Sequence, residues 1–167
     1  MTPGQLLTDA LGRVAEGVPA VLDGLSSDEL GHRPTPDANP IGWLVWHLTR
    51  VYDDHVAAVS DQPQVYVEGG YTERFGLPFD DREIGYGHSS EQVALVQAPG
   101  ELLAEYAAAV HARMSPWLSG LDAAELDRVV DERWDPPVTL GVRLVSVVND
   151  LSQHLGQAAY VRGLLGH

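Results

Sequence analysis

Two ionisable residues four positions apart, Asp150 and His154, form the most informative motif of the chain. Both fall in an apolar-periodic stretch typical of an α-helix, so their side chains project from one face about one turn apart. His47 occupies a second helical stretch, beside an apolar stripe that includes Trp43 and Val51. If the two helices pack together, two imidazoles and one carboxylate converge inside a bundle and leave coordination positions open. The three residues therefore predict a reactive metal site.

Two imidazoles and a carboxylate suit a borderline-hard divalent cation such as Zn²⁺, Ni²⁺, Fe²⁺ or Mn²⁺. A cation with an open position lowers the pKa of a bound water or thiol. The alternative is that Asp150 and His154 form an ordinary hydrogen bond that braces the last helix. Against it, a carboxylate bordering an apolar stripe needs a strong partner to offset its desolvation. The spacing alone leaves both interpretations open.

Several residues around the motif also have two interpretations each. Gln157 is either a surface residue or a hydrogen-bond partner that orients a ligand imidazole. His88 either points at the site or helps to cap the third helix, and Arg143 either meets an anionic substrate or pairs with a surface carboxylate. Trp43 is expected in the core or at the rim of the site. Trp134, in a proline-rich stretch, is the best candidate to line a pocket.

The composition narrows the possible chemistry. A chain of 167 residues with 44% hydrophobic and 20% charged residues is expected to form one globular domain, residues 1–167. The chain has no cysteine and no lysine, which excludes a cysteine nucleophile and a Schiff base, so any thiol chemistry uses an external thiol. The net charge of −14 opposes binding to nucleic acid. No apolar run spans a membrane and no signal pattern is visible, so we expect a cytoplasmic protein.

Four stretches with a 3.6-residue apolar period are expected to be helical and to position these residues. They run from Thr2 to about Gly24, from Asn39 to about Ser60, over about 90–119 and over about 140–165. The expected start signals are Thr2 before Pro3, Asn39 before Pro40, Ser89 with Gln92, and Thr139. Pro19 and the Pro99-Gly100 pair are expected to bend their helices. The pattern predicts an all-α four-helix bundle with long crossover connections.

The segments that connect the expected helices differ in length and in expected structure. Residues 27–39 are expected to be a connector with at most one helical turn. Residues 61–88 form an unusually long crossing rich in glycine, proline and aromatic residues, and such a length is typical of a segment that crosses a bundle or builds a binding site. Its aromatic content predicts that it packs against the bundle. Residues 121–138 are expected to be an irregular return to the last helix.

At these residues the sequence resembles the DinB/YfiT-like superfamily. The resemblance rests on Asn39-Pro40-Ile41-Gly42-Trp43-Leu44-Val45-Trp46-His47-Leu48 and on Asp150-Leu151-Ser152-Gln153-His154-Leu155-Gly156-Gln157. Arg74-Phe75-Gly76-Leu77-Pro78-Phe79 and Gly85-Tyr86-Gly87-His88-Ser89 are similar to stretches of its actinobacterial branch, the mycothiol-dependent, maleylpyruvate isomerase-like proteins. The resemblance spans nearly the whole chain.

The resemblance implies a four-helix bundle, often dimeric, with a divalent metal on the second and last helices. Carried over position by position, the ligands are His47, Asp150 and His154, with Asp150 at a position where the family usually has histidine. The resemblance also implies thiol chemistry, because several family members catalyse a transfer or an isomerisation with a low-molecular-weight thiol such as mycothiol. The first hypothesis is therefore a metal-dependent thiol transferase acting on a small electrophile. The second is a non-enzymatic dimeric scaffold that binds a metal or small ligand, and a third is metal-dependent hydrolysis.

Overall fold

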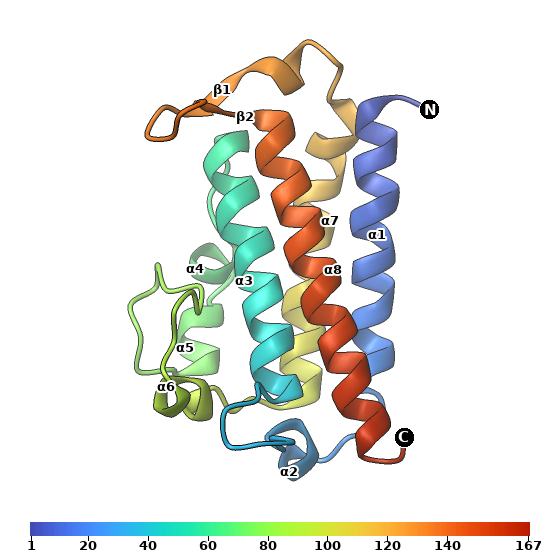
Figure 1. Ribbon diagram of the computed structural model, residues 1–167, viewed down its shortest axis with the longest axis vertical. Helices are drawn as coiled ribbons and strands as arrows, with labels where there is room; N and C mark the ends of the chain where they lie inside the picture. Colours follow the sequence, from blue (N-terminus) through green and yellow to red (C-terminus); the bar gives the residue numbers. More distant parts are fainter.

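The protein, described over residues 1–167 by a computed structural model, consists of four long helices packed side by side (Figure 1). The long helices are α1 (Pro3–Leu22), α3 (Ile41–Ser60), α7 (Gly100–Gly120) and α8 (Leu140–Leu164). The shorter elements are α2 (Ser27–Leu30), α4 (Val65–Glu68), α5 (Tyr71–Phe75), α6 (Ser90–Leu95), a 3-10 turn (Glu125–Asp127), β1 (Val129–Asp131) and β2 (Val138–Thr139). The predicted all-α bundle is confirmed; the antiparallel β1–β2 pair within the return segment was not expected.

The order of the helices explains the long crossing. Helix α3 packs against α7 and α8, and α1 packs against the same two helices, so α1 and α3 lie across the bundle from each other. Helices α3 and α7 run in the same direction, and residues 61–99 return along the outside of the bundle between them (Figure 1). Helix α8 runs antiparallel to α3 beside it. This pairing brings the second turn of α3 close to the middle of α8.

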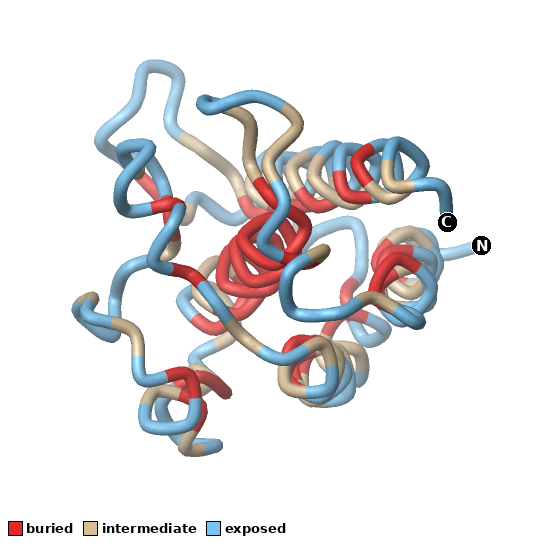
Figure 2. Tube along the Cα trace, turned by 90° about the horizontal axis from the view of Figure 1, so that it is seen from below, coloured by how far each residue is buried: buried red, intermediate tan, exposed pale blue.

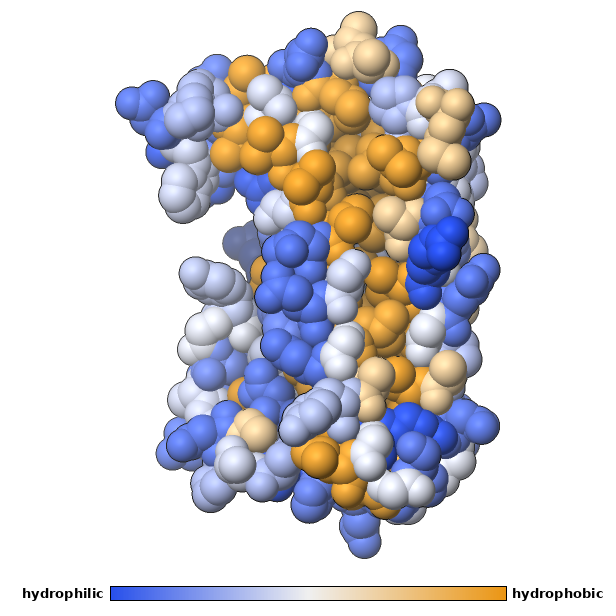
Figure 3. Space-filling view, turned by 45° about the vertical axis from the view of Figure 1, so that its right-hand side comes forward, coloured by the Kyte–Doolittle hydropathy of each residue, from blue (hydrophilic) through white to orange (hydrophobic).

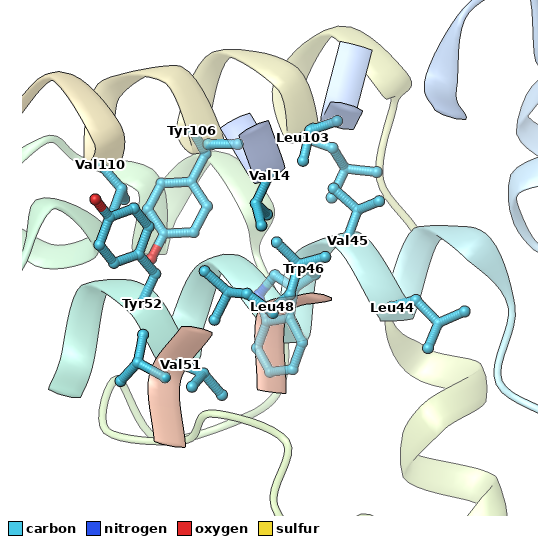
Figure 4. Close-up of a cluster of buried hydrophobic side chains, with 14 of the residues drawn as sticks. Val14, Leu44, Val45, Trp46, Leu48, Val51, Tyr52, Leu103, Tyr106 and Val110 are labelled. Atoms are coloured by element: carbon cyan, nitrogen blue, oxygen red, sulfur yellow. The ribbon is translucent and has the colours of Figure 1, made fainter. Parts of the chain in front are cut away.

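Helix α3 is the central helix of the bundle. Every residue from Ile41 to Asp53 is buried, and the tube in Figure 2 shows this helix enclosed by the others. A helix with apolar residues on all sides is typical of such a position. Its side chains meet Val14 of α1 and Tyr106 of α7 in one cluster (Figure 4). A ligand on this helix is therefore held by packing on every side.

The start signals are confirmed for three of the four predicted helices. Capping hydrogen bonds are present at Thr2, Ser89 and Thr139. The second helix begins one residue later than expected, because Pro40 is extended and takes the N-cap position without a side-chain hydrogen bond. Asn39, the predicted cap, lines a surface groove instead.

The third predicted helix was wrong as a single element. Helix α6 ends at Leu95 and α7 begins at Gly100, and only α7 belongs to the bundle. Pro99 has no N–H to donate and disfavours helical geometry in the residue before it, which separates the two helices. Pro19, by contrast, lies inside α1, which continues through it to Leu22 without a break.

The crossing packs against the bundle through most of its aromatic residues. Tyr66, Tyr71 and Phe75 are buried, and all three rings lie around Tyr106 of α7, with centroid distances of 5.5, 4.8 and 5.7 Å respectively. Tyr86 is the exception, because it is 88% exposed. The predicted packing of the crossing is therefore confirmed, with the side chain of Tyr86 as the one aromatic group that points away from the bundle.

Apolar side chains also reach the surface along one side of the bundle. Figure 3 shows them as a band on the face where α1 and α8 lie side by side. Leu6 on α1 is 59% exposed, and Val142 and Val145 on α8 are 57% and 65% exposed. None of the helices is both long enough and apolar enough to cross a membrane.

Candidate metal site

Helices α3 and α8 bring the three predicted ligands together. His47, Asp150 and His154 each offer one ligand atom, and these atoms lie within 4.8 Å of one another. His47 is only 5% exposed, whereas the side chains of Asp150 and His154 are 35% and 19% exposed. The cluster is therefore anchored in the core on one side and reachable from solvent on the other.

Both imidazoles are oriented by an acceptor outside the cluster. We assign the Nδ1 proton of His154 to a hydrogen bond with Oε1 of Gln157 at 2.9 Å, which leaves Nε2 to face Asp150. Nδ1 of His47 donates in the same way to the carbonyl oxygen of Ile84. Outer acceptors of this kind fix the tautomer and ring orientation of histidine ligands in metal sites. Gln157 therefore occupies the orienting position that the sequence suggested for it.

The carboxylate of Asp150 lacks the partners that a purely structural role requires. Its Oδ2 lies 3.6 Å from Nε2 of His154, beyond hydrogen-bonding distance. Its Oδ1 is buried and has no hydrogen-bond partner. A buried carboxylate oxygen without a partner carries a desolvation cost that a cation offsets. The donor set and the orphaned oxygen both fit a divalent cation.

The protonation states of His47 and Asp150 suit metal binding, whereas a metal ion would have to displace the proton that His154 holds more tightly. Burial lowers the pKa of the His47 imidazole. Burial acts to raise the pKa of Asp150, but the neighbouring imidazoles outweigh it and hold that pKa below its ordinary value. Burial acts to lower the pKa of His154, but the Asp150 carboxylate and Gln157 have the larger effect and raise this pKa. At neutral pH His47 is thus neutral and Asp150 ionised, the forms in which these residues bind metals.

The crossing approaches His47 so closely that only glycine fits. Gly85 has φ +92°, and a Cβ atom added there would lie 2.8 Å from Nδ1 of His47 and 3.0 Å from the Trp46 ring. Its neighbour Ile84 supplies the carbonyl that receives the His47 proton. Glycine at this position therefore lets the backbone itself act as the orienting group.

A buried arginine, which the sequence analysis missed, holds this backbone in place. Arg50 is 0% exposed and donates from Nε to the carbonyl of Glu83 at 3.1 Å and from Nη2 to that of Asp81 at 2.9 Å. Both Nη atoms also donate to Oε1 of Gln64 at 3.0 Å. Because Arg50 lies one turn from His47 on α3, one helix carries both the candidate ligand and the residue that fixes its orienting segment.

Asp53 completes this buried network. It is 0% exposed and accepts hydrogen bonds from the backbone N–H groups of Val65 and Tyr66 at 2.8 and 2.7 Å and from the hydroxyl of Tyr106 at 2.8 Å. Its Oδ2 lies 3.5 Å from Nη1 of Arg50. The available sequence signal was an arginine and an aspartate three apart within a largely apolar helix, a spacing that pairs them on one face.

Trp43 and His88 form the aromatic wall of the site. The Trp43 ring stacks on His47 with a centroid distance of 4.6 Å, and its Nε1 donates to Nδ1 of His88 at 3.2 Å. The His88 side chain is 2% exposed and packs between Trp46 and Phe79. Of its two interpretations, the structure places His88 beside the site, while the neighbouring serine caps α6.

Trp134 and Arg143 lie away from the cluster, and of the two interpretations of Arg143 the structure shows the pairing with a carboxylate. Trp134 is 65% exposed in the turn between β1 and β2, beyond the first turn of α8. Arg143 pairs with Oδ2 of Asp131 at 3.2 Å and so ties α8 to this hairpin. The hairpin contains Trp134 and binds Arg143, because it folds back on the start of α8. Arg143 lies about 10 Å along the helix axis from Asp150.

Comparison with known proteins agrees with the sequence motifs. The sequence profile of the mycothiol-S-transferase family matches residues 6–166. A crystal structure described as the conserved protein of a locus from Enterococcus faecalis superposes with a TM-score of 0.91 at 33% identity, covering 100% of this chain and 99% of the other. No curated protein matches the chain. The resemblance to the mycothiol-dependent DinB-like proteins is thus confirmed, and the chain belongs to the mycothiol-S-transferase family.

Proposed function

We propose that the protein is a divalent-metal-dependent S-transferase or isomerase that uses a mycothiol-type thiol to act on a small electrophile. The observation that carries the proposal is the cluster of His47, Asp150 and His154, in which both imidazoles are oriented from outside and one carboxylate oxygen has no partner. The family match supports the thiol. The donor set admits Zn²⁺, Ni²⁺, Mn²⁺ or Fe²⁺.

The residues present indicate which roles in the reaction belong to the metal ion, to the co-substrate and to the chain. A bound divalent ion would lower the pKa of a thiol and so supply a thiolate at neutral pH. The chain has no cysteine, so the reacting sulfur belongs to the co-substrate. His47, from the core side, and Asp150 and His154, from the solvent side, would hold the ion. Trp43 and His88 help to exclude water from the core side of the cluster, because the Trp43 ring stacks on His47 and the His88 ring lies against Trp43.

The scaffold hypothesis is less well supported by the geometry. It requires a structural Asp150–His154 hydrogen bond, and the two side chains are 3.6 Å apart with Oδ1 of Asp150 unpartnered. Removing His154 should therefore have little effect on the stability of the metal-free protein. A His154→Ala variant that is destabilised equally with and without a chelator would favour the scaffold.

The first experiment is the metal content of untagged protein, followed by mycothiol transfer to a small electrophile. Wild type is compared with His47→Ala and Asp150→Ala, and His32→Ala serves as a control because His32 is exposed and outside the cluster. We expect near-stoichiometric metal in wild type and the control, and loss of both metal and transfer in the two ligand variants. Turnover without added thiol would instead indicate metal-dependent hydrolysis. Absence of bound metal after addition of all four ions would refute the proposal.

We also propose a homodimer that buries the apolar band of α1 and α8. Contiguous exposed apolar residues on a helix face are typical of protein interfaces. Leu6, Val142 and Val145 are exposed apolar residues of this kind at the end of the bundle near the hairpin. Because the band continues along the length of the bundle in Figure 3, it presents an extended surface to a second copy.

A further inference from the structure

His88 is a buried histidine whose hydrogen bonds the proposed chemistry does not use. Its side chain is 2% exposed, and its ring lies against those of Trp46 and Phe79 at centroid distances of 5.9 and 4.7 Å. Its Nδ1 lies 3.2 Å from Nε1 of Trp43. An indole N–H only donates, so Nδ1 is the acceptor, and we assign the proton of the ring to Nε2. The one acceptor atom of the imidazole is therefore used on Trp43.

The other ring nitrogen of His88 makes no comparable hydrogen bond. Nε2 is buried without a partner, and Oε2 of Glu83, at 3.5 Å, is beyond hydrogen-bonding distance. A buried donor without an acceptor lowers the stability of the folded protein. An apolar ring of similar size would pack at this position without that cost. The acceptor at Nδ1 is thus the feature that distinguishes His88 from a residue that only fills space.

The partner of His88, Trp43, contacts both imidazoles of the cluster. Its ring stacks on His47 with a centroid distance of 4.6 Å and an interplanar angle of 14°. Its edge meets His154 with a centroid distance of 6.2 Å and an angle of 90°. The χ2 torsion of tryptophan is broad, so a hydrogen bond at the indole N–H restricts the plane of the ring. Rotation of this ring would disturb the packing of both imidazoles.

We infer that His88 is a positioning residue of the candidate metal site and acts through Trp43. Nδ1 of His88 fixes the plane of the indole, and the indole fixes the imidazoles of His47 and His154. The crossing, which carries His88, is thereby linked to candidate ligands on two helices. The inference rests on the metal site of the proposed function but not on its thiol chemistry.

Two substitutions separate the acceptor from the ring. His88→Phe keeps a ring between Trp46 and Phe79 but removes the acceptor. His88→Asn keeps an acceptor, because Oδ1 of asparagine and Nδ1 of histidine are equally far from Cβ along the side chain, but it loses the ring. We expect His88→Phe to bind Zn²⁺ about tenfold more weakly, the lower end of the range for a lost orienting group, with little change in Tm. His88→Asn should show the reverse, a lower Tm with Zn²⁺ affinity close to that of wild type.

His111→Phe is the matched control. Nδ1 of His111 lies 3.4 Å from the hydroxyl of Tyr52, so this variant also removes a histidine nitrogen beside an aromatic donor, but outside the cluster. Its Zn²⁺ affinity should equal that of wild type. Zn²⁺ affinity that falls with Tm, so that His88→Asn loses it and His88→Phe retains it, would overturn the inference.

A double-mutant cycle tests whether His88 acts through Trp43. Trp43→Phe removes the indole N–H, so the acceptor on His88 then has nothing to bind. In the Trp43→Phe background, His88→Phe should cause no further loss of Zn²⁺ affinity, which makes the two effects non-additive. Fully additive effects would contradict the proposed route.

Nuclear magnetic resonance of the metal-free protein separates this inference from the proposed function. The chain has four tryptophans, and the indole N–H signal that disappears in Trp43→Phe belongs to Trp43. This proton should exchange with solvent about tenfold faster in His88→Phe than in wild type, and at nearly the wild-type rate in His88→Asn. The ¹⁵N shifts of the His47 ring should indicate one tautomer in wild type and move toward the average of two in His88→Phe. Equal exchange rates and equal shifts in wild type and His88→Phe would overturn the inference, whether or not the protein binds metal. Wild type that binds no divalent ion would overturn the proposed function, and these signals would still decide whether His88 positions the two rings.

Discussion

Replacement of Arg50 tests the link between the buried network and the metal site. Arg50→Met keeps a side chain of similar length but removes the donors to Glu83, Asp81 and Gln64 and leaves the carboxylate of Asp53 without its buried cation. Removing one partner of a buried ion pair costs about 3–5 kcal/mol. For a chain of this size about 1 kcal/mol corresponds to roughly 2–4 °C, so we expect Tm to fall by about 6–20 °C.

The second consequence is local to the metal. Without Arg50 the segment 81–85 loses its anchors, and the Ile84 carbonyl no longer fixes the His47 ring. Loss of an outer orienting group typically weakens metal binding by about 10–100-fold. Arg50→Lys separates the two effects: it retains the charge that stabilises Asp53 but not the planar fork that reaches several carbonyls. We expect a smaller loss of stability in Arg50→Lys and a similar loss of metal affinity.

The assays are urea denaturation of metal-free protein and calorimetric titration with Zn²⁺ at a temperature where each variant is folded. Arg13→Met is the matched control, because Arg13 pairs with Asp9 on the surface and its side chain is 75% exposed. Such a pair contributes less than about 1 kcal/mol. Equal urea midpoints for Arg50→Met and Arg13→Met would refute the stability argument. Unchanged Zn²⁺ affinity in both Arg50 variants would refute the positioning argument.

Three further predictions follow from individual contacts. Gly85→Ala should weaken metal binding, because its Cβ atom would meet Nδ1 of His47. Gly87→Ala is the control: Gly87 is also at positive φ but has no atom within 4 Å of an added Cβ, so this variant should lose only stability. Equal metal affinity in the two variants would contradict the close approach. Val145→Glu should convert the proposed dimer to a monomer in light scattering without loss of helicity, and a monomeric wild type would rule out that interface. Burial lowers the pKa of His111 from its ordinary value of 6.5, so the unfolded chain binds a proton more readily there. Stability present above pH 6.5 should therefore fall as the pH drops below it, and His111→Asn should show a smaller fall in urea midpoint between pH 7 and 5.

The predicted features that the structure reproduces are those with a local cause. The 3.6-residue period of apolar side chains and the capping residues Thr2, Ser89 and Thr139 place the starts of three predicted helices, because both signals act within one or two turns. The spacing of Asp150 and His154 puts them on one face for the same reason. The length of the 61–88 segment indicated a crossing, since parallel neighbouring helices require a long connection. The family followed from motifs that span the chain.

The features that were missed depend on contacts between distant parts of the chain. One exception is local: the Pro99-Gly100 pair was expected only to bend one continuous helix, but α6 ends at Leu95 and Pro99 caps α7. Arg143 had two local interpretations, and only the folded hairpin supplied its carboxylate partner, Asp131. His88 had two local interpretations, and only the packing of the crossing on Trp43 and Trp46 placed its ring beside the site.

By itself the sequence determined the type of fold, the family and the identity of the three candidate ligands, because periodicity, capping and spacing are properties of neighbouring residues. Only the tertiary structure decided how those ligands are oriented. The acceptor for His47 is a backbone carbonyl 37 residues away, held there by Arg50 through the crossing. A backbone carbonyl has no sequence signature, and a buried arginine shows its partners only once the chain has folded around it. The surface groove lined by Asn39 and Gln157 arises in the same way, from two segments that meet only in the folded bundle.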